Sequence, residues 1–312
     1  MIDYDAHGWS RTLLRVTGTV APRILGRVLL ITGWALAVVA FHRYEVAIEA
    51  PSTVHTLVGV ALGLLLVFRT NASYERFWEG RKLWAGIVNA GRNLGRASAA
   101  FLADQPQLLE RVLLWGAGFP HAAMHWLRDE PAALGGAAAR LPPAEVAETL
   151  RAAHPPAAVA QRISACLAHA WRSGAVSDRV ATMIDANAQQ LVDHVGGCER
   201  IRDTPLPFAY AAHLRLALVL YCLTLPFALV GAFGWATVPD TLLVAYILFG
   251  IEEIGVEVEN PFGHDYNDLP LERFCETVEG ELMALAGVPS AGDAAAEAAD
   301  AAGRQPARPV AA

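Results

Sequence analysis

Charge is scarce in this sequence for a chain of its length. Of its 312 residues, 18% are charged and 54% are hydrophobic, and the mean hydropathy is +0.33. Soluble globular domains carry about 25% charged residues, so the composition excludes an ordinary soluble protein and favours a membrane protein. Basic blocks are absent as well, and the net charge of −7 argues against nucleic acid as a partner.

Cysteine and the usual catalytic motifs are equally scarce. The four cysteines are scattered without a CxxC pair, which supports neither a zinc site nor a disulfide framework. They are Cys166, Cys198, Cys222 and Cys275. The sequence contains no GxSxG motif and no phosphate-binding glycine loop. We therefore expect a protein that is not an enzyme and that carries no catalytic cofactor.

Two histidines have the spacing of metal ligands. His121 and His125 are four residues apart on a predicted helix, but the segment HAAMHW is otherwise apolar and has no glutamate between them. The zinc-binding helix of metalloproteases places a glutamate there. Packing within a helix bundle is therefore the favoured interpretation of this pair, and metal binding is the alternative.

Long apolar stretches are what the sequence has in abundance. Four of them lie at residues 24–41, 50–68, 216–233 and 241–251. A membrane-spanning helix needs about 20 mainly apolar residues, with a range near 17 to 25. The second and third stretches meet this length outright. The first and fourth meet it only where their polar ends reach headgroups or a protein-lined cavity, so we expect four transmembrane helices.

Basic residues follow a consistent pattern around these stretches. Arginines precede the first stretch, follow the second and precede the third, whereas the link GWATVPD before the fourth has none. Positive charge marks the cytoplasmic side of membrane proteins. Both termini and the long middle region are therefore expected in the cytoplasm.

The regions between and around the stretches divide by composition. No alternating pattern typical of strands occurs, and the middle region is rich in Ala, Leu, Arg, Glu and Gln, so an all-α fold is predicted. The expected divisions are a cytosolic segment at 1–23, transmembrane helices at 24–68, a helical cytosolic region at 69–207, transmembrane helices at 208–251, an acidic turn and helix at 252–287, and a disordered Ala-rich tail at 288–312.

The second apolar stretch continues into polar sequence at Arg69 without a glycine, proline or turn cluster. This predicts one helix that runs from lipid into a polar environment. Val60, Leu64 and Phe68 recur every four residues and form one stripe on that helix. The stripe continues through Asn71, Glu75 and Trp78. It fits a pore-lining face, and a lipid-facing or core stripe is the alternative, which periodicity alone favours.

Leu206 lies between two prolines at the entrance to the third stretch. Each proline fixes its own φ, and Pro207 excludes the helical region for Leu206. The segment RDTPLPFAY is therefore predicted to mark a helix boundary that holds the Leu206 side chain in one direction.

An acidic segment follows the fourth stretch. Residues 252–274 gather six carboxylates around an Asn-Pro-Phe-Gly turn: Glu252, Glu253, Glu257, Glu259, Asp265 and Asp268. Oxygen ligands of this density suit a hard cation such as calcium, although the spacing is not that of an EF-hand loop. A solvated acidic face with a capping turn is the alternative, and residue types alone favour it.

Three motifs in this order resemble one family. FRTNASYERFWEGRKLW, TPLPFAY and ENPFGHDYNDLPLE are similar to motifs of the bestrophins, in their bacterial branch. The resemblance implies a homopentameric ion channel of the bacterial inner membrane, in which each subunit places four transmembrane helices and a helical cytosolic domain around one central pore. Its partners would be its own copies, monovalent ions and membrane lipid.

The resemblance also assigns roles to residues. Val60, Leu64 and Phe68 match a hydrophobic pore neck, and Leu206 matches a cytosolic aperture. Animal members are calcium-activated anion channels, and the residues at or beside their calcium positions are Glu257, Asn260, Asp265 and Asp268. If these residues retain a cation site, calcium is expected to raise the melting temperature. The acidic run after the turn is thinned here to HDYND, which leaves calcium control open.

The sign of the conducted ion also stays open. Animal relatives conduct chloride, and bacterial relatives have been linked to sodium or potassium. Glu75 is the candidate for charge selection in the vestibule below the neck, because five carboxylates near one axis would attract cations.

Two other functions fit the composition. A secondary transporter would use ionisable residues within the membrane, such as Arg215, Glu252 or Glu253, but no inverted repeat is visible. A membrane scaffold without conduction would bind a partner through its cytosolic helices. The three motifs favour the channel.

Overall fold

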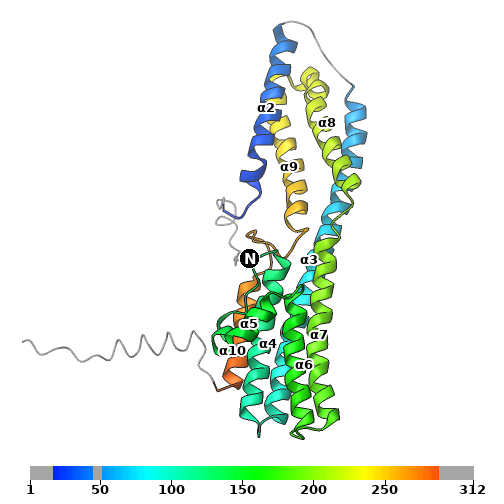
Figure 1. Cartoon of the computed structure of the whole chain (residues 1–312). Coiled ribbons are helices and arrows are strands. Elements are labelled where there is room, and N and C mark those ends of the chain that lie inside the picture. Colours follow the sequence, from blue (N-terminus) through cyan, green and yellow to red (C-terminus); the bar gives the residue numbers. More distant parts are fainter. Residues whose placement is uncertain (1–16, 45–50, 288–312) are drawn as a thin grey trace, which may run out of the picture. The chain divides into compact units, whose positions relative to one another are not determined.

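The computed structural model describes residues 17–44 and 51–287, and this part of the chain is helical, without strands. The helices are α2 (Ala21–Tyr44), α3 (Ser52–Phe101), α4 (Pro106–Leu127), α5 (Pro143–Leu150), α6 (Pro155–Arg172), α7 (Asp178–Asp203), α8 (Phe208–Phe233), α9 (Thr237–Glu257) and α10 (Leu271–Leu285), with 3₁₀ turns η1 (Gly136–Arg140) and η2 (Gly234–Ala236) (Figure 1). The all-α prediction is confirmed for the described residues. The predicted tail at 288–312 and most of the segment 1–23 lie outside them.

The chain divides into two compact units. Unit one comprises residues 1–79 and 203–269, and unit two comprises residues 80–202 and 270–312. α3 contributes to both, because its 50 residues contain no proline and continue without a break past Arg69. The predicted single helix across the apolar-to-polar change is therefore present.

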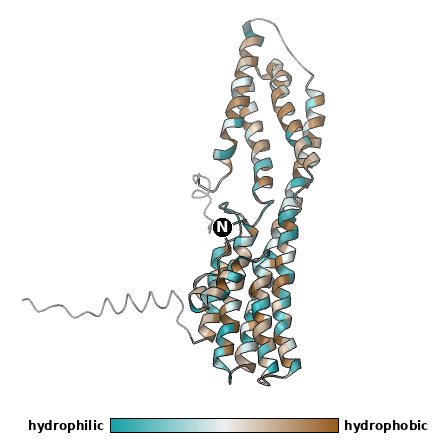
Figure 2. Ribbon diagram, in the orientation of Figure 1, coloured by the Kyte–Doolittle hydropathy of each residue, from teal (hydrophilic) through white to brown (hydrophobic). Residues whose placement is uncertain are grey.

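Unit one is a bundle of apolar helices. α2, α8 and α9 pack against one another, and hydrophobic residues dominate all three helices and the first part of α3 (Figure 2). Its buried core takes side chains from four helices: Ile24, Val28, Ile31, Leu62, Leu66, Leu214, Leu218, Cys222, Ala245 and Phe249. The core thus joins residues that are far apart in sequence.

Three helical stretches among the described residues are long and apolar enough to cross a membrane: Ala21–Tyr44, Ser52–Phe101 and Phe208–Glu257. The last of these contains both α8 and α9, which lie side by side (Figure 1). Gly234 ends α8 with a φ of +52°, a left-handed conformation that glycine adopts without strain, and the chain then turns back into α9.

Unit two is built on α4, which packs against both α6 and α10. Trp84, Trp115 and Phe119 are fully buried in this unit. Gly197 of α7 (Asp178–Asp203) has a packing role, since a Cβ there would lie 2.6 Å from a methyl carbon of Leu83. A larger residue at Gly197 would therefore force the Leu83 side chain of α3 to move.

Candidate functional site

The predicted neck residues lie on an open face of α3. The side chains of Val60, Leu64 and Phe68 are between 54% and 71% exposed, whereas Leu62 and Leu66 are buried. A helix turns by about 100° per residue, so a residue two positions away lies on nearly the opposite face. The stripe is therefore not part of the core of unit one, and the core-stripe interpretation is wrong. A lipid-facing or pore-lining face remains.

The open face continues beyond the apolar part of α3. Asn71, Glu75 and Trp78 are all exposed and belong to the same stripe, so the sequence-predicted vestibule residue Glu75 lies in line with the neck residues. The open face thus changes from apolar to polar as the helix passes Arg69.

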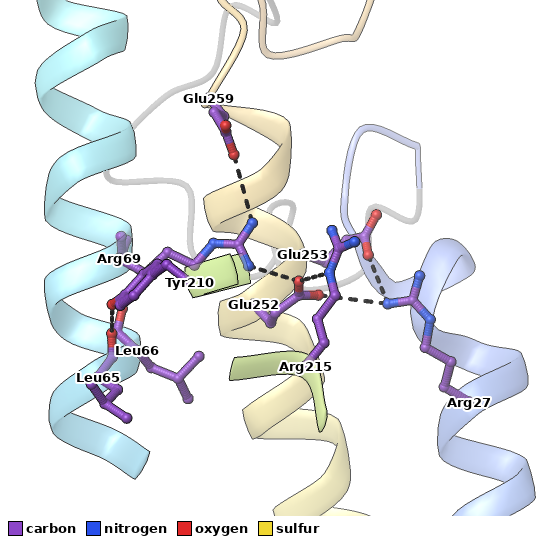
Figure 3. Close-up of polar contacts among 10 residues, drawn as sticks. Arg27, Leu65, Leu66, Arg69, Tyr210, Arg215, Glu252, Glu253 and Glu259 are labelled. Carbon is purple, nitrogen blue, oxygen red and sulfur yellow. Dashed lines mark hydrogen bonds and ion pairs between the residues drawn. The ribbon is translucent and has the colours of Figure 1, made fainter. Parts of the chain in front are cut away.

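Arg69 itself lies on the packed side of α3, in an ion-pair cluster around Glu252 (Figure 3). Its Nη1 donates to Glu252 Oε1 at 2.9 Å, and Arg215 Nε donates to the same oxygen at 2.8 Å. Arg27 Nη1 lies 3.7 Å from Glu252 Oε2 and donates to Glu253 Oε2 at 3.0 Å. One carboxylate of α9 therefore binds arginines of α2, α3 and α8.

The cluster explains why charge appears where each apolar stretch ends. Arg27, Arg69, Arg215 and Glu252 each border an uncharged run in their own helix, and the fold brings all four together. Removing one partner of a buried ion pair typically costs about 3–5 kcal/mol, because the other charge stays buried without compensation. Arg215, Glu252 and Glu253, which suggested a transporter, thus form ion pairs that hold the helices of unit one together.

Leu206 is held by Glu259, which the sequence placed in the acidic segment but did not connect with Leu206. The Leu206 N–H donates to Glu259 Oε1 at 3.0 Å, and Glu259 Oε2 lies 3.6 Å from Arg69 Nη2 (Figure 3). Arg76 supports the same segment, since its Nε donates to the Glu259 carbonyl at 3.1 Å and its Nη1 to the Thr204 carbonyl at 2.5 Å. Glu259 therefore links the Leu206 segment to the residue that follows Phe68.

The proline-framed boundary is present as predicted. Pro207 is the N-cap of α8, with φ −54° and ψ 126°, and the helix begins at Phe208. Tyr210 of the same motif donates its hydroxyl hydrogen to the Leu65 carbonyl of α3 at 3.0 Å (Figure 3). The start of α8 is thus fixed to α3 close to the neck residues.

The acidic turn joins two of the predicted calcium residues directly, Asp265 and Asp268, and it places an arginine against Asp265 and Glu257. Arg23 Nη2 donates to Asp265 Oδ1 at 2.5 Å, and Arg23 Nη1 lies 3.9 Å from Glu257 Oε2. Asp268 Oδ2 accepts the Asp265 N–H at 2.7 Å, and Asn260 Oδ1 accepts the Phe262 N–H at 3.4 Å. Across residues 17–44 and 51–287, no cluster of three or more His, Cys, Asp or Glu side chains is arranged to hold a metal.

Calcium binding at this turn stays a prediction, and Arg23 gives it a direct test. Because Arg23 already pairs with two of the carboxylates, millimolar calcium is expected to raise the melting temperature of Arg23→Gln by more than that of the wild type. Melting curves with calcium and with chelator measure this difference. Arg43→Gln, at the other end of α2, is the matched control. Equal responses in all three proteins would remove the calcium assignment.

The two histidines with metal-ligand spacing bind different carboxylates. His121 Nε2 lies 2.7 Å from Glu279 Oε2, and His125 Nδ1 lies 2.8 Å from Glu130 Oε2. Glu279 Oε1 also accepts the Ala137 N–H at 2.7 Å. The histidines therefore serve packing within unit two, as the sequence favoured.

Burial opposes ionisation of Glu279, but the hydrogen bond and charge of His121 and the N–H groups of Gly136 and Ala137 outweigh it and lower the pKa of this carboxyl. A carboxylate with a lowered pKa stabilises the fold above its unfolded pKa, which is about 4.3 for glutamate. This contribution is lost as the pH falls through the lower pKa of the folded state.

Glu279→Gln is therefore expected to lower the free energy of unfolding of unit two by about 1–3 kcal/mol at pH 7. From pH 7 downward, the difference between the variant and the wild type should persist until the pH falls through the lowered folded-state pKa of Glu279, where the wild-type carboxyl is protonated as well. Melting temperatures across this pH range test both statements. Glu281→Gln, which removes an exposed pair with Arg92 from the same helix, should have little effect. A loss in Glu279→Gln that is constant with pH would contradict the ion-pair explanation.

Comparison with known proteins agrees with the three motifs. Residues 1–284 match the family described as Bacterial/Fungal Bestrophin protein. A voltage-dependent anion channel-forming protein of Synechocystis is 39% identical over 286 residues, which cover 90% of this chain and 92% of the relative. The voltage-dependent anion channel-forming protein YneE of Escherichia coli is 31% identical, over 91% of this chain and 94% of the relative.

A solved structure is similar over most of its length. The crystal structure of a bacterial bestrophin homologue from Klebsiella pneumoniae matches with a TM-score of 0.79 and 30% identity, and the match covers 85% of this chain and 99% of that one. The family and the names of these relatives indicate an ion channel and not an enzyme. With its apolar helices, its three motifs and these matches, the chain belongs to the bacterial branch of the bestrophin family.

Proposed function

We propose that this protein is a homopentameric channel for small monovalent ions, with four transmembrane helices per subunit. It would lie in the bacterial inner membrane with both termini in the cytoplasm. The observation that supports this most is the open stripe of Val60, Leu64 and Phe68, on the side of α3 turned away from its packed face. Five copies of α3 around one axis would turn this stripe into stacked apolar rings.

The proposed neck acts through the cost of wetting an apolar constriction. Water leaves a narrow apolar ring readily, so the ring stops ions without a moving plug. A second ring would come from Leu206, whose backbone is restricted by Pro205 and Pro207 and whose N–H is bound by Glu259. This ring carries no fixed charge, so it would select by ion size and by the cost of dehydration.

The proposed charge preference comes from Glu75. Its carboxylate is exposed and follows the neck residues along the stripe, where five copies would raise the local concentration of cations. The names of the relatives say that they form anion channels. We propose that Glu75 shifts the permeability of this chain toward cations relative to a channel without that carboxylate.

A planar-bilayer recording of the purified protein tests the channel proposal. Unitary currents that follow the ion gradient, without a coupled substrate, support it, and the reversal potential in asymmetric potassium chloride gives the sign of the ion. The mass of the assembly in detergent gives the number of subunits. A folded, inserted protein without conductance, or with saturable flux coupled to a second solute, would overturn the proposal.

A further inference from the structure

A cavity of about 330 Å³ lies in unit one between α2, α8 and α9. Its lining combines charged and apolar side chains: Arg27, Arg215, Leu218, Val219, Phe249, Glu252, Glu253 and Val256. It lies where the uncharged runs of these three helices end, which is the level at which a membrane changes from acyl chains to headgroups. The neck residues Val60, Leu64 and Phe68 are not part of its lining.

The charges of this cavity are layered. The side chains of Arg27 and Arg215 are 51% and 56% exposed, whereas those of Glu252 and Glu253 are 3% and 10% exposed. The guanidinium groups therefore cover the carboxylates and form the accessible charge of the cavity. Each carboxylate is also ion-paired to at least one arginine, which limits its repulsion of a third anion.

Arg27 and Arg215 both have N–H groups that donate to no partner among the described residues. A guanidinium has five N–H groups, and the contacts within unit one use only Nε of Arg215 and Nη1 of Arg27. Among the described residues, the Nη groups of Arg215 have no hydrogen-bond partner, and the same is true of Nη2 of Arg27. Planar pairs of free N–H groups suit phosphate oxygens, which arginine binds with two parallel hydrogen bonds.

We propose that this cavity binds the phosphodiester headgroup of an anionic phospholipid. Arg27 and Arg215 would hold the phosphate, and one acyl chain would lie along Val219 and Val256, the two apolar lining residues that are not buried. Basic pockets between transmembrane helices at the membrane surface are a general mode of anionic-lipid recognition. Because Arg27 and Arg215 both pair with Glu252, the lipid would also stabilise the cluster that joins the four helices of unit one. The proposal does not depend on ion conduction.

Two variants separate the parts of the proposed site. Val219→Trp fills the apolar wall and leaves every ion pair in place. Its matched control is Leu243→Trp, at an exposed apolar position of α9 outside the cavity lining. Arg215→Gln removes one phosphate ligand, and its matched control is Arg43→Gln at the far end of α2. If Arg215→Gln fails to fold, Val219→Trp still tests the site.

Native mass spectrometry of the delipidated protein, titrated with phosphatidylglycerol, phosphatidylethanolamine or phosphatidylcholine, provides the measurement. We expect phosphatidylglycerol to bind best, and Val219→Trp and Arg215→Gln to weaken it about tenfold while both controls bind like the wild type. Equal retention of the three lipids, or no effect of either variant, would overturn the proposal. Stabilisation by inorganic phosphate equal to that by the lipid would assign the site to a free anion. Loss of the oligomer in Val219→Trp would assign the cavity to a neighbouring subunit.

Discussion

Replacing Val60, Leu64 and Phe68 together by alanine is expected to raise the basal current of the reconstituted protein roughly tenfold. In the proposed neck, each substitution would widen one apolar ring and lower the free-energy cost of filling it with water. All three side chains lie on the open face of α3, so their truncation leaves the buried core of unit one intact. Single-channel recording gives the open probability and the unitary conductance separately.

A matched control keeps this experiment specific. Leu29, Leu30 and Leu36 of α2 are also exposed and apolar, so alanine at these three positions removes comparable surface from a different helix. Their replacement should leave the current unchanged. If the α3 triple variant has the conductance and open probability of the wild type, these residues do not form the neck. If both triple variants conduct more, the effect comes from general loosening of the bundle.

Glu75→Gln is expected to move the reversal potential toward the anion side in asymmetric salt. A ring of carboxylates attracts cations and repels anions, and its reach grows at low ionic strength because the Debye length is about 30 Å at 0.01 M. The shift should therefore be larger in dilute salt than in concentrated salt. Asn71→Asp adds a carboxylate to the same open stripe and should move the reversal potential the opposite way.

Leu206→Ala is the contrasting variant for this measurement. It should raise conductance and admit larger ions while leaving the reversal potential nearly unchanged, because leucine carries no charge to remove. The N–H at position 206 remains available to Glu259 in this variant, so the segment should keep its place. Inverted selectivity in Leu206→Ala, together with a silent Glu75→Gln, would mean that the roles of the two positions are exchanged.

Much of unit one follows from local sequence pattern. Periodicity predicted that Val60, Leu64 and Phe68 share one face of α3, because residues four apart always do so in a helix. The lack of a helix breaker at Arg69 predicted a single continuous helix, and Pro207 predicted where α8 begins. The fourth apolar stretch was harder to interpret, since the uncharged run 241–251 is short and α9 qualifies as a span only together with α8.

Tertiary structure alone decided which face of α3 packs against the bundle and which charged residues form ion pairs. Periodicity identifies the stripes of a helix but cannot tell which one packs, and only the burial of Leu62 and Leu66 shows that the Val60 stripe faces outward. The cluster around Glu252 also could not be predicted, because it joins charges from four helices that are as much as 226 residues apart. Residues only four positions apart, such as Val60 and Leu64, share a face through helix geometry alone. The charged residues around Glu252 are far apart in sequence, so they meet only because their helices pack together. No local pattern in the sequence encodes that arrangement.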